Sequence, residues 1–345
     1  MKILILIMLT SCAKLSYLAE QGVGQLRLQW NGKKVEKVLS DPEVKNEVKE
    51  KIKKIEVYKK YFYDYFEKKP SAIYSKVTFL ENQAVTHLVI ASYYDRVEPL
   101  KTSFPFMGAF PYLGFFKEKS AIKYQEKLEK KDYHTYKRPV YAYSTLGKLQ
   151  DRILSSFFRY SDEGLAELIF HELFHTIFFV KSNVDLNENL ANYFGKEMMK
   201  EYFHFDEAKN QKMNSSYKSS KVIRSTLVSL IKKYKAGIKK KPIKSPKEGK
   251  ERLNSFLENS FFPKIKKTCS ELGLKKCFPL EMKWNHASFS AFMTYEKKGE
   301  FIKDLRSKYK IKNLKEYYHF LESQLEIFKK EKKYKSFTKH LEGLL

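Results

Sequence analysis

The segment GLAELIFHELFHTIFF, residues 164–179, contains two histidines and two glutamates within a largely apolar run. If it is helical, apolar side chains cover most of its circumference, and a helix of this kind must be buried. His171, Glu172 and His175 would then lie inside the fold, where polar groups need polar partners. The chain is therefore expected to build a helix-containing core around these three side chains.

The spacing of the two histidines predicts a metal site. Residues four apart lie on one face of a helix, so His171 and His175 could bind the same ion at about 2 Å. Glu172 is rotated by about 100° from His171, so we expect it to hydrogen-bond a water molecule on that ion. This is the H-E-x-x-H pattern, in which the glutamate is the general base of metallopeptidases. Two core histidines with ordinary hydrogen-bond partners are the alternative.

A third ligand is expected from the next helix. The longer pattern H-E-x-x-H-x-x-G-x-x-H is excluded, because Phe178 and Lys181 occupy its glycine and final histidine positions. The following residues can reverse the chain, and DLNENLANYFGKEMM, 185–199, has the pattern of a helix with Glu188 in its first turn. If the two helices pack antiparallel, Glu188 faces the histidines.

Glu188 has two rivals as the third ligand, Glu197 and Asp185. A further alternative is structural: Asp185 and Glu188 form a D-x-x-E helix start, in which the glutamate only caps backbone amides. Two histidines, one carboxylate and one water position are typical of a catalytic zinc site with one ion per chain. A zinc site of this type polarises a carbonyl and activates water, while Glu172 would move the proton to the leaving amine.

Such a reaction also needs a donor for the oxyanion. Tyr295, Tyr143 and His286 are the candidates. The alternative for each is a packing or surface role, because a chain with 24 tyrosines offers many coincidences.

The N-terminal segment MKILILIMLTSC, residues 1–12, predicts export. Its apolar run is too short to span a bilayer, which needs about 20 residues, but suits an export signal. Residues 9–12 resemble the bacterial lipobox, which implies cleavage before Cys12 and acylation of its thiol. The alternatives are an ordinary signal peptide or a buried starting segment. We expect residues 1–11 to be a lipoprotein signal peptide and the remaining chain to be anchored to a membrane by lipid.

Two further cysteines, Cys269 and Cys277, are too few for a four-cysteine zinc site. In an exported protein, a disulfide between them is plausible and would contribute roughly 2–3 kcal/mol. Two unrelated thiols are the alternative.

The secondary-structure pattern predicts a helix-rich α+β protein with a small sheet in its first half and a largely helical second half. Residues 13–70 read mainly as helix, Thr86–Tyr94 is the best strand candidate, and Pro139–Gly147 is a candidate for a strand followed by a loop. Between them, FPFMGAFPYLGFF, 104–116, has the glycines and prolines of a loop but is apolar enough to cover a core or cleft. From Gly164 onward the pattern is mostly helical.

The domain boundaries follow from composition. Residues 232–250 are rich in lysine, with two prolines and two glycines, and predict an exposed linker or surface loop. The catalytic core would then comprise residues 12–231, and residues 251–345 would form a helical part that packs on it.

The formal net charge of +27 is the other unusual feature of the chain. It favours anionic partners but is also what a lysine-rich solvated surface produces. The alternative function is therefore a non-enzymatic basic envelope lipoprotein that binds anionic polymers, with affinity that falls steeply with salt. Nucleic acid is not an expected partner, because the lysine runs lack regular aromatic interleaving and the chain is expected to be exported.

An ordered set of segments resembles the bacterial putative aminopeptidases over residues 11–297. It comprises SYLAEQGVGQL, FPFMGAFPYLGFF, AYSTLG, LAELIFHELFH, NENLA and KWNHASFSAFMTY. The resemblance implies an exported or lipobox-bearing zinc peptidase of the gluzincin type with a zincin-like fold. It would act on peptides in the periplasm or at the surface of the bacterial cell envelope.

Carried over by position, the resemblance implies His171, His175 and Glu188 as zinc ligands, Glu172 as base and Tyr295 as oxyanion donor. The chain departs from the pattern at Gly195, where relatives often have an acidic residue. It also has Ser103 and Ala109 where many relatives have cysteines.

Overall fold

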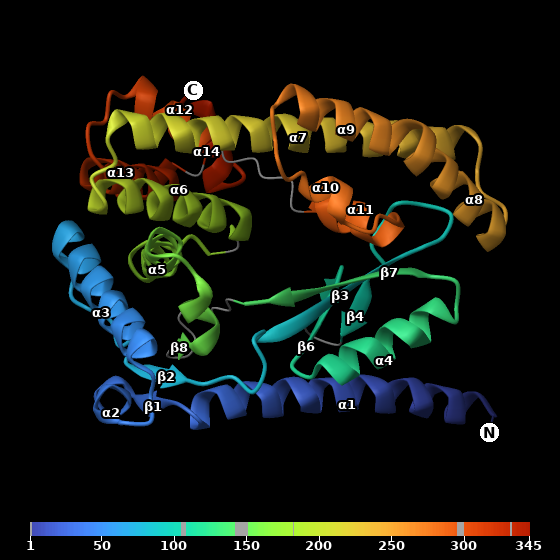
Figure 1. Ribbon diagram of the computed structural model, residues 1–345, viewed down its shortest axis with the longest axis horizontal. Helices are drawn as coiled ribbons and strands as arrows, with labels where there is room; N and C mark the ends of the chain where they lie inside the picture. Colours follow the sequence, from blue (N-terminus) through green and yellow to red (C-terminus); the bar gives the residue numbers. More distant parts are fainter. Residues whose placement is uncertain (1, 105–107, 142–150, 182, 295–299, 332) are drawn as a thin grey trace. The chain divides into compact units, whose positions relative to one another are not determined.

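The computed structural model describes residues 2–104, 108–141, 151–181, 183–294, 300–331 and 333–345 (Figure 1). The chain divides into two compact units. The first comprises Met1–Leu26, Ala84–Val140 and Glu207–Glu296, and the second comprises Arg27–Gln83, Tyr141–Asp206 and Lys297–Leu345. Both units are discontinuous in sequence, whereas the division expected from the sequence was into residues 12–231 and 251–345. No described helix is long and apolar enough to cross a bilayer.

The first unit contains helix α1 up to residue 26, two small sheets and several helices. Its strands and early helices are α1 (Lys2–Trp30), β3 (Thr86–Ser92), β4 (Thr102–Phe104), β5 (Gly108–Phe110), β6 (Leu113–Phe115), α4 (Glu118–Glu129) and β7 (His134–Val140). Strand β3 pairs antiparallel with β6 on one side and with β7 on the other, while β4 and β5 form a separate hairpin. The segment expected to be a loop at 104–116 therefore contains short strands.

Strand β3 is buried along its whole length because both of its faces are covered. Leu88 and Ile90 pack with Ala287 and Ala291 on one face, as the alternation of a strand requires. Val89 points the other way, into a cluster with Phe104, Leu113, Phe115 and Ala121. The strand expected at Thr86–Tyr94 is thus confirmed. The strand-then-loop candidate at Pro139–Gly147 begins at the end of β7, which ends at Val140; residues 142–150 lie outside the described residues.

The rest of the first unit is helical. It consists of α7 (Glu207–Lys240), α8 (Pro246–Phe256), a π turn (Leu257–Phe261), α9 (Phe262–Glu271), α10 (Phe278–Glu281) and α11 (His286–Thr294). The linker expected at 232–250 is corrected by these bounds, because only residues 241–245 separate α7 from α8. Ile231, Tyr234 and Ile238 occur at helical spacing and bury one side of this lysine-rich stretch.

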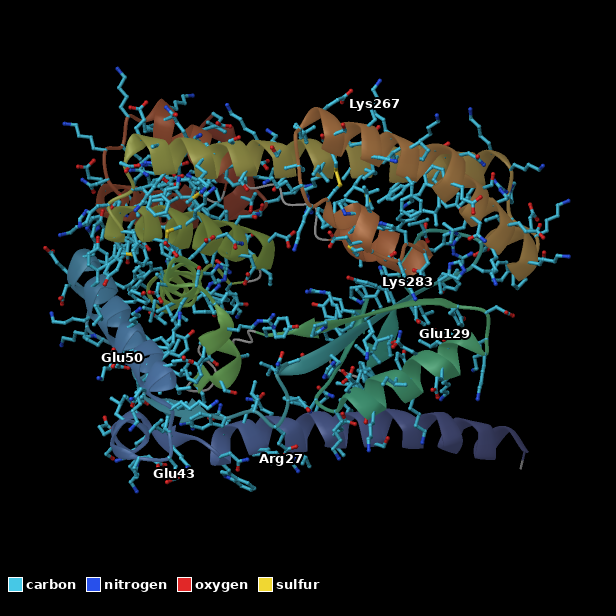
Figure 2. All side chains as sticks on the ribbon, viewed as in Figure 1. Arg27, Glu43, Glu50, Glu129, Lys267 and Lys283 are labelled. Atoms are coloured by element: carbon cyan, nitrogen blue, oxygen red, sulfur yellow. A yellow bond between two sulfur atoms is a disulfide. The ribbon has the colours of Figure 1, made fainter. Side chains whose placement is uncertain are left out.

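A disulfide joins Cys269 to Cys277, one of the two arrangements expected from the sequence (Figure 2). It closes a short loop between α9 and α10. Loop closure of this size restricts the unfolded chain and stabilises the fold by roughly 2–3 kcal/mol.

His286 is fully buried at the start of α11. Its Nδ1 donates to the carbonyl oxygen of Tyr93 at 3.0 Å, and its Nε2 accepts from the hydroxyl of Tyr234 at 2.9 Å. Burial, with the charge of His134 adding to it, lowers the pKa of His286 to about 4. Because both ring nitrogens are engaged inside the first unit, His286 has no atom left for a substrate oxyanion, which corrects its candidacy as a donor.

Acid is expected to destabilise the protein through His286. A histidine in an unfolded chain has a pKa of about 6.5, so between that pH and about 4 the unfolded chain binds more protons. The stabilisation is complete above about pH 6.5 and is lost toward pH 4, at a cost of about 3 kcal/mol. Urea denaturation at neutral and acid pH measures this loss. It should be smaller in His286→Gln and unchanged in the exposed control His319→Gln; equal losses in parent and His286→Gln would contradict the assignment.

The second unit contains a small sheet and a bundle of helices. It comprises the end of α1, β1 (Lys33–Lys34), α2 (Val35–Ser40), α3 (Asn46–Phe66), β2 (Lys76–Thr78), β8 (Ile153–Leu154), a 3₁₀ turn (Ser155–Arg159), α5 (Asp162–Ile177), α6 (Val184–Tyr202), α12 (Glu300–Lys308), α13 (Leu314–Glu331) and α14 (Phe337–Gly343). Strand β2 pairs antiparallel with β1 and parallel with β8. The described chain is thus helix-rich with small sheets, which fits the expected α+β class.

Candidate metal centre

Helix α5, which carries the H-E-x-x-H pattern, has a defined start. The Oγ of Ser161 accepts a hydrogen bond from the backbone N–H of Gly164 at 3.2 Å, which caps the helix. Asp162 in the first turn binds Lys51 of α3 at 2.8 Å and also contacts Lys54. Hydrogen bonds from these lysines lower the pKa of Asp162, and its negative charge suits the positive end of the helix dipole.

The rest of α5 is enclosed by apolar and aromatic side chains of α3, α6 and α13. Phe170 contacts Phe62, and Phe174 stacks on Phe194 with ring centroids 4.2 Å apart. At the C-terminal end, the hydroxyl of Tyr318 lies 3.3 Å from the carbonyl oxygen of Ile177. This confirms the sequence-based expectation of a buried helix and fixes where its histidines lie.

The chain between α5 and α6 is held by Asn187. Its side-chain oxygen accepts from the N–H of Val180, and its side-chain amide donates to the carbonyl of Val180, both at 2.9 Å. Asn187 is buried, so these two bonds fix the reversal of the chain and the first turn of α6. The next residue is Glu188, whose position the reversal therefore sets.

Glu188 reaches both histidines of α5. Its Oε2 lies 3.5 Å from Nε2 of His171, and its Oε1 lies 3.4 Å from Nε2 of His175. The two imidazole rings have centroids 5.0 Å apart and are nearly perpendicular. Interaction with the imidazoles holds the pKa of Glu188 well below its usual range. The carboxylate is therefore available in its charged form.

These separations fit the donor set of a zinc ion. Zinc binds imidazole nitrogen and carboxylate oxygen at about 2.0–2.2 Å in a tetrahedron, whose edges are then about 3.4 Å long. Each nitrogen–oxygen distance at Glu188 is close to such an edge, with one carboxylate oxygen facing each histidine. They exceed the usual hydrogen-bond range of about 2.7–3.2 Å. The three side chains thus have the chemistry and spacing of a metal-binding set.

Glu172 lies beside this set. His171, Glu172 and His175 offer donor atoms that all lie within 4.8 Å of one another. Glu172 is only 9% exposed. The pKa of Tyr74 is raised well above its normal value, first by the burial of Tyr74 itself and then by the negative charge of Glu172. Tyr74 is itself buried and has a left-handed backbone with φ of 64°, which is unusual for a bulky residue. The hydroxyl of Tyr74, which Glu172 influences, therefore stays protonated.

One rival of Glu188 has another partner. Glu197 binds Lys200 at 2.6 Å. Helix α6 begins at Val184 with Asn183 as its N-cap and no side-chain cap bond, so the alternative capping box of Asp185 with Glu188 is not formed. The sequence-predicted ligands His171, His175 and Glu188 are thus brought together, with Glu172 next to them.

Three sequence predictions cannot be placed. Tyr295 and Tyr143 lie outside the described residues, as does the side chain of Cys12.

Gly195 explains how α6 comes close enough to α5. A Cβ at this position would lie 2.9 Å from both the carbonyl oxygen of Glu167 and the backbone nitrogen of His171. No side chain fits between the two backbones, so an acidic residue there would push the helices apart. In this chain the departure from the family pattern is therefore a packing requirement beside His171.

Replacing Gly195 with Ala is expected to destabilise the protein by about 1–3 kcal/mol, because the added methyl group overpacks the helix interface. Thermal unfolding measures the change. The matched control is Gly237→Ala on α7, where a Cβ meets nothing within 4 Å; it should stabilise the protein by about 0.5–1 kcal/mol through helix propensity. A Gly195→Ala protein as stable as the parent would show that the helices tolerate a larger separation.

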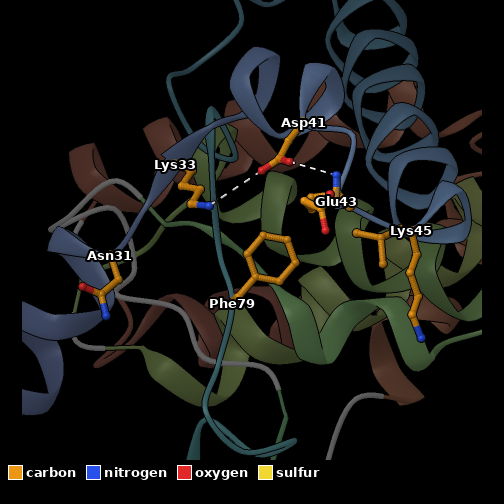
Figure 3. A pocket seen from close by; sticks show the side chains of 8 residues that line it. Asn31, Lys33, Asp41, Glu43, Lys45 and Phe79 are labelled. Carbon is orange, nitrogen blue, oxygen red and sulfur yellow. Dashed lines mark hydrogen bonds and ion pairs between the residues drawn. The ribbon is translucent and has the colours of Figure 1, made fainter.

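The described cavity of about 500 Å³ lies elsewhere in the second unit, beside the start of α3 (Figure 3). It is lined by Asn31, Lys33, Asp41, Glu43, Val44, Lys45, Val48 and Phe79. Lys33 pairs with Asp41 at 3.9 Å across it. None of the predicted catalytic or metal-binding residues lines this cavity, so it has no place in the reaction considered below.

Comparison with known proteins identifies the family. A sequence profile of the family described as "Putative aminopeptidase" matches residues 16–337. The chain belongs to this family. Neither the curated proteins nor the solved structures contain a match. The match spans α5 and α6 and almost all of the remaining elements, so the aminopeptidase family covers both compact units.

Proposed function

We propose that this member of the aminopeptidase family is a zinc-dependent peptidase with a zincin-like catalytic core, anchored by lipid at the bacterial cell envelope. The observation that carries the proposal is the convergence of His171, His175 and Glu188, with nitrogen–oxygen separations of 3.4 and 3.5 Å. Family membership supports peptide-bond hydrolysis, and the name of the family favours removal of N-terminal residues.

In the proposed site, the Nε2 atoms of His171 and His175 and the carboxylate of Glu188 would hold one zinc ion. When bound, zinc supplies a Lewis acid that makes water acidic and polarises the scissile carbonyl. A carboxylate oxygen of Glu172 takes a proton from the attacking water as the new C–O bond forms. Glu172 then delivers that proton to the amine nitrogen as the C–N bond breaks.

Glu172 is buried on α5, with 9% of its surface exposed. The side chain is on α5 with both histidines, so one helix carries the base and two of the three proposed ligands. Tyr295 is the proposed oxyanion donor, on the basis of its position in the family pattern.

The proposed location follows from the N-terminal sequence. Cleavage before Cys12 and acylation of its thiol would anchor the chain to a membrane, with both units in the periplasm or at the cell exterior. A single attached chain gives weak binding and two or more give stable anchoring.

The proposed activity is tested by treating the purified chain with a zinc chelator. Hydrolysis of an unmodified peptide should fall at least about a hundredfold and return when one equivalent of zinc is added. Mass spectrometry of the products separates the two modes of cleavage: an aminopeptidase releases single residues and spares the matched N-acetylated peptide. Hydrolysis at the full rate in the zinc-free chain would contradict the proposal.

A further inference from the structure

Helix α1 exposes large apolar side chains to solvent. Four large apolar side chains lie on one exposed side of it, and we call them the apolar stripe. They are Leu18, Val23, Leu26 and Trp30, with exposed fractions of 36%, 57%, 49% and 79%. A helix that faces only water places such residues inward and polar residues outward. On α1 four large apolar residues face outward, although Leu28 is buried.

The opposite side of α1 is firmly docked on the first unit. Tyr17 contacts Phe104 and Phe115, with ring centroids 5.5 and 5.3 Å away. Gly24 lies against the ring of Phe116, where a Cβ would clash, and Glu20 accepts a hydrogen bond from the N–H of Lys117 at 3.2 Å. Rotation of the helix to bury its stripe would break these contacts. The stripe is therefore held outward by the fold.

Polar side chains occupy part of the docked side. The amide nitrogen of Gln21 and the amide oxygen of Gln25 are buried and have no hydrogen-bond partner among the described residues. Burying such atoms is unfavourable, as is exposing large apolar groups. A helix with glutamines inside and leucine, valine and tryptophan outside is suited to an apolar medium.

The stripe follows closely on the proposed site of acylation. Cys12 precedes Leu18, the first residue of the stripe, by six residues in the sequence. At about 1.5 Å per residue, the helix from Leu18 to Trp30 is about 18 Å long.

We propose that the apolar stripe of α1 lies in the surface layer of a phospholipid bilayer, with the helix parallel to the membrane. The proposed orientation of α1 on the membrane rests on the proposed acylation of Cys12. It does not depend on the peptidase reaction. An acyl group on Cys12, six residues before Leu18 in the sequence, would bring the stripe to the membrane. Tryptophan favours the boundary between headgroups and acyl chains, and interfacial helices bury an apolar side of this kind without spanning the bilayer.

The test places the purified acylated chain in phosphatidylglycerol–phosphatidylcholine vesicles whose acyl chains carry bromine, a contact quencher of tryptophan. The chain has a second, buried tryptophan, Trp284. The difference in emission between the parent and Trp30→Phe gives the emission of Trp30 alone. Trp30 emission should fall roughly twofold or more in brominated vesicles. The triple variant Leu18→Gln/Val23→Gln/Leu26→Gln should remove most of this quenching.

The matched control is Val57→Gln/Val222→Gln, which changes two exposed valines outside α1 and should leave quenching unchanged. Circular dichroism should give all variants the parental melting temperature, since the altered side chains are exposed. Unquenched Trp30 in vesicle-bound protein would overturn the proposal. A second result would also overturn it: the parent forms a dimer and shows no quenching, while the triple variant is a monomer. A second copy of the chain would then cover the stripe.

Mass spectrometry of Cys12 separates this inference from the proposed anchor. If Cys12 carries no acyl group, the anchor fails, and the unmodified chain is mixed with the same vesicles. Co-sedimentation with quenching of Trp30 would still support the stripe as a membrane surface, whereas its absence would overturn it. Neither result bears on peptide hydrolysis.

Discussion

The Glu172→Gln protein is expected to cleave peptides about 10²–10⁴-fold more slowly than the parent, with its zinc retained. Glutamine has the size of glutamate but cannot accept the proton of the attacking water. The residue is not among the proposed ligands. Because glutamine fills the same volume at this buried position, which is 9% exposed, the replacement should keep the packing of α5. The loss should therefore appear in kcat at unchanged metal content.

Steady-state kinetics on a single peptide, with the zinc content of each preparation, measures this effect. The matched control is Glu163→Gln, an exposed position in the first turn of the same helix, which should keep kcat within about twofold of the parent. If Glu172→Gln cleaves as fast as the parent, Glu172 is not the base, whatever the metal content.

The second large effect is expected at Glu188. Replacing it with Gln removes a negative charge that contacts both imidazoles. Zinc affinity should fall at least about a hundredfold, since even changes outside the ligand set commonly cost about 10–100-fold. The carboxylate also compensates the ion's charge, which a neutral amide cannot do.

Competition between the protein and a chelator of known affinity measures the zinc affinity. The matched control is Glu197→Gln on the same helix α6, because Glu197 was the rival ligand and binds Lys200. It should bind zinc as the parent does. Loss of zinc from Glu197→Gln, with normal affinity in Glu188→Gln, would transfer the ligand role to Glu197.

The parts of the site that the sequence could predict depend on local geometry. Spacing alone places His171 and His175 one turn apart on a helix. The short segment after α5 can reverse the chain, which lets a carboxylate near the start of the next helix, such as Glu188, meet the histidines. Each of these relations joins residues close in sequence, where helix periodicity determines the direction of the side chains.

The features that the sequence could not predict depend on contacts between distant elements or on backbone angles. The left-handed φ of Tyr74 beside Glu172 has no signal in the surrounding residues. The role of Gly195 appears only when its distance to the backbone of His171 is known. Asn187 could have been suspected from its place before Glu188, but its bonds to Val180 require the folded loop.

The same reasoning applies to the fold. The helices and β3 follow from periodicity, whereas the division into two discontinuous units depends on packing between segments up to hundreds of residues apart. The lysine-rich stretch at 232–250 was expected to be a linker because of its composition. Its buried Tyr234 and Ile238 instead anchor it as part of α7.

Anomalous diffraction at the zinc absorption edge, from crystals of the purified protein, tests the central claim most directly. One peak per chain is expected, about 2.0–2.2 Å from Nε2 of His171, Nε2 of His175 and a carboxylate oxygen of Glu188. A zinc-containing crystal with its peak away from these three side chains, or zinc-free crystals of a protein that still cleaves peptides, would contradict the account.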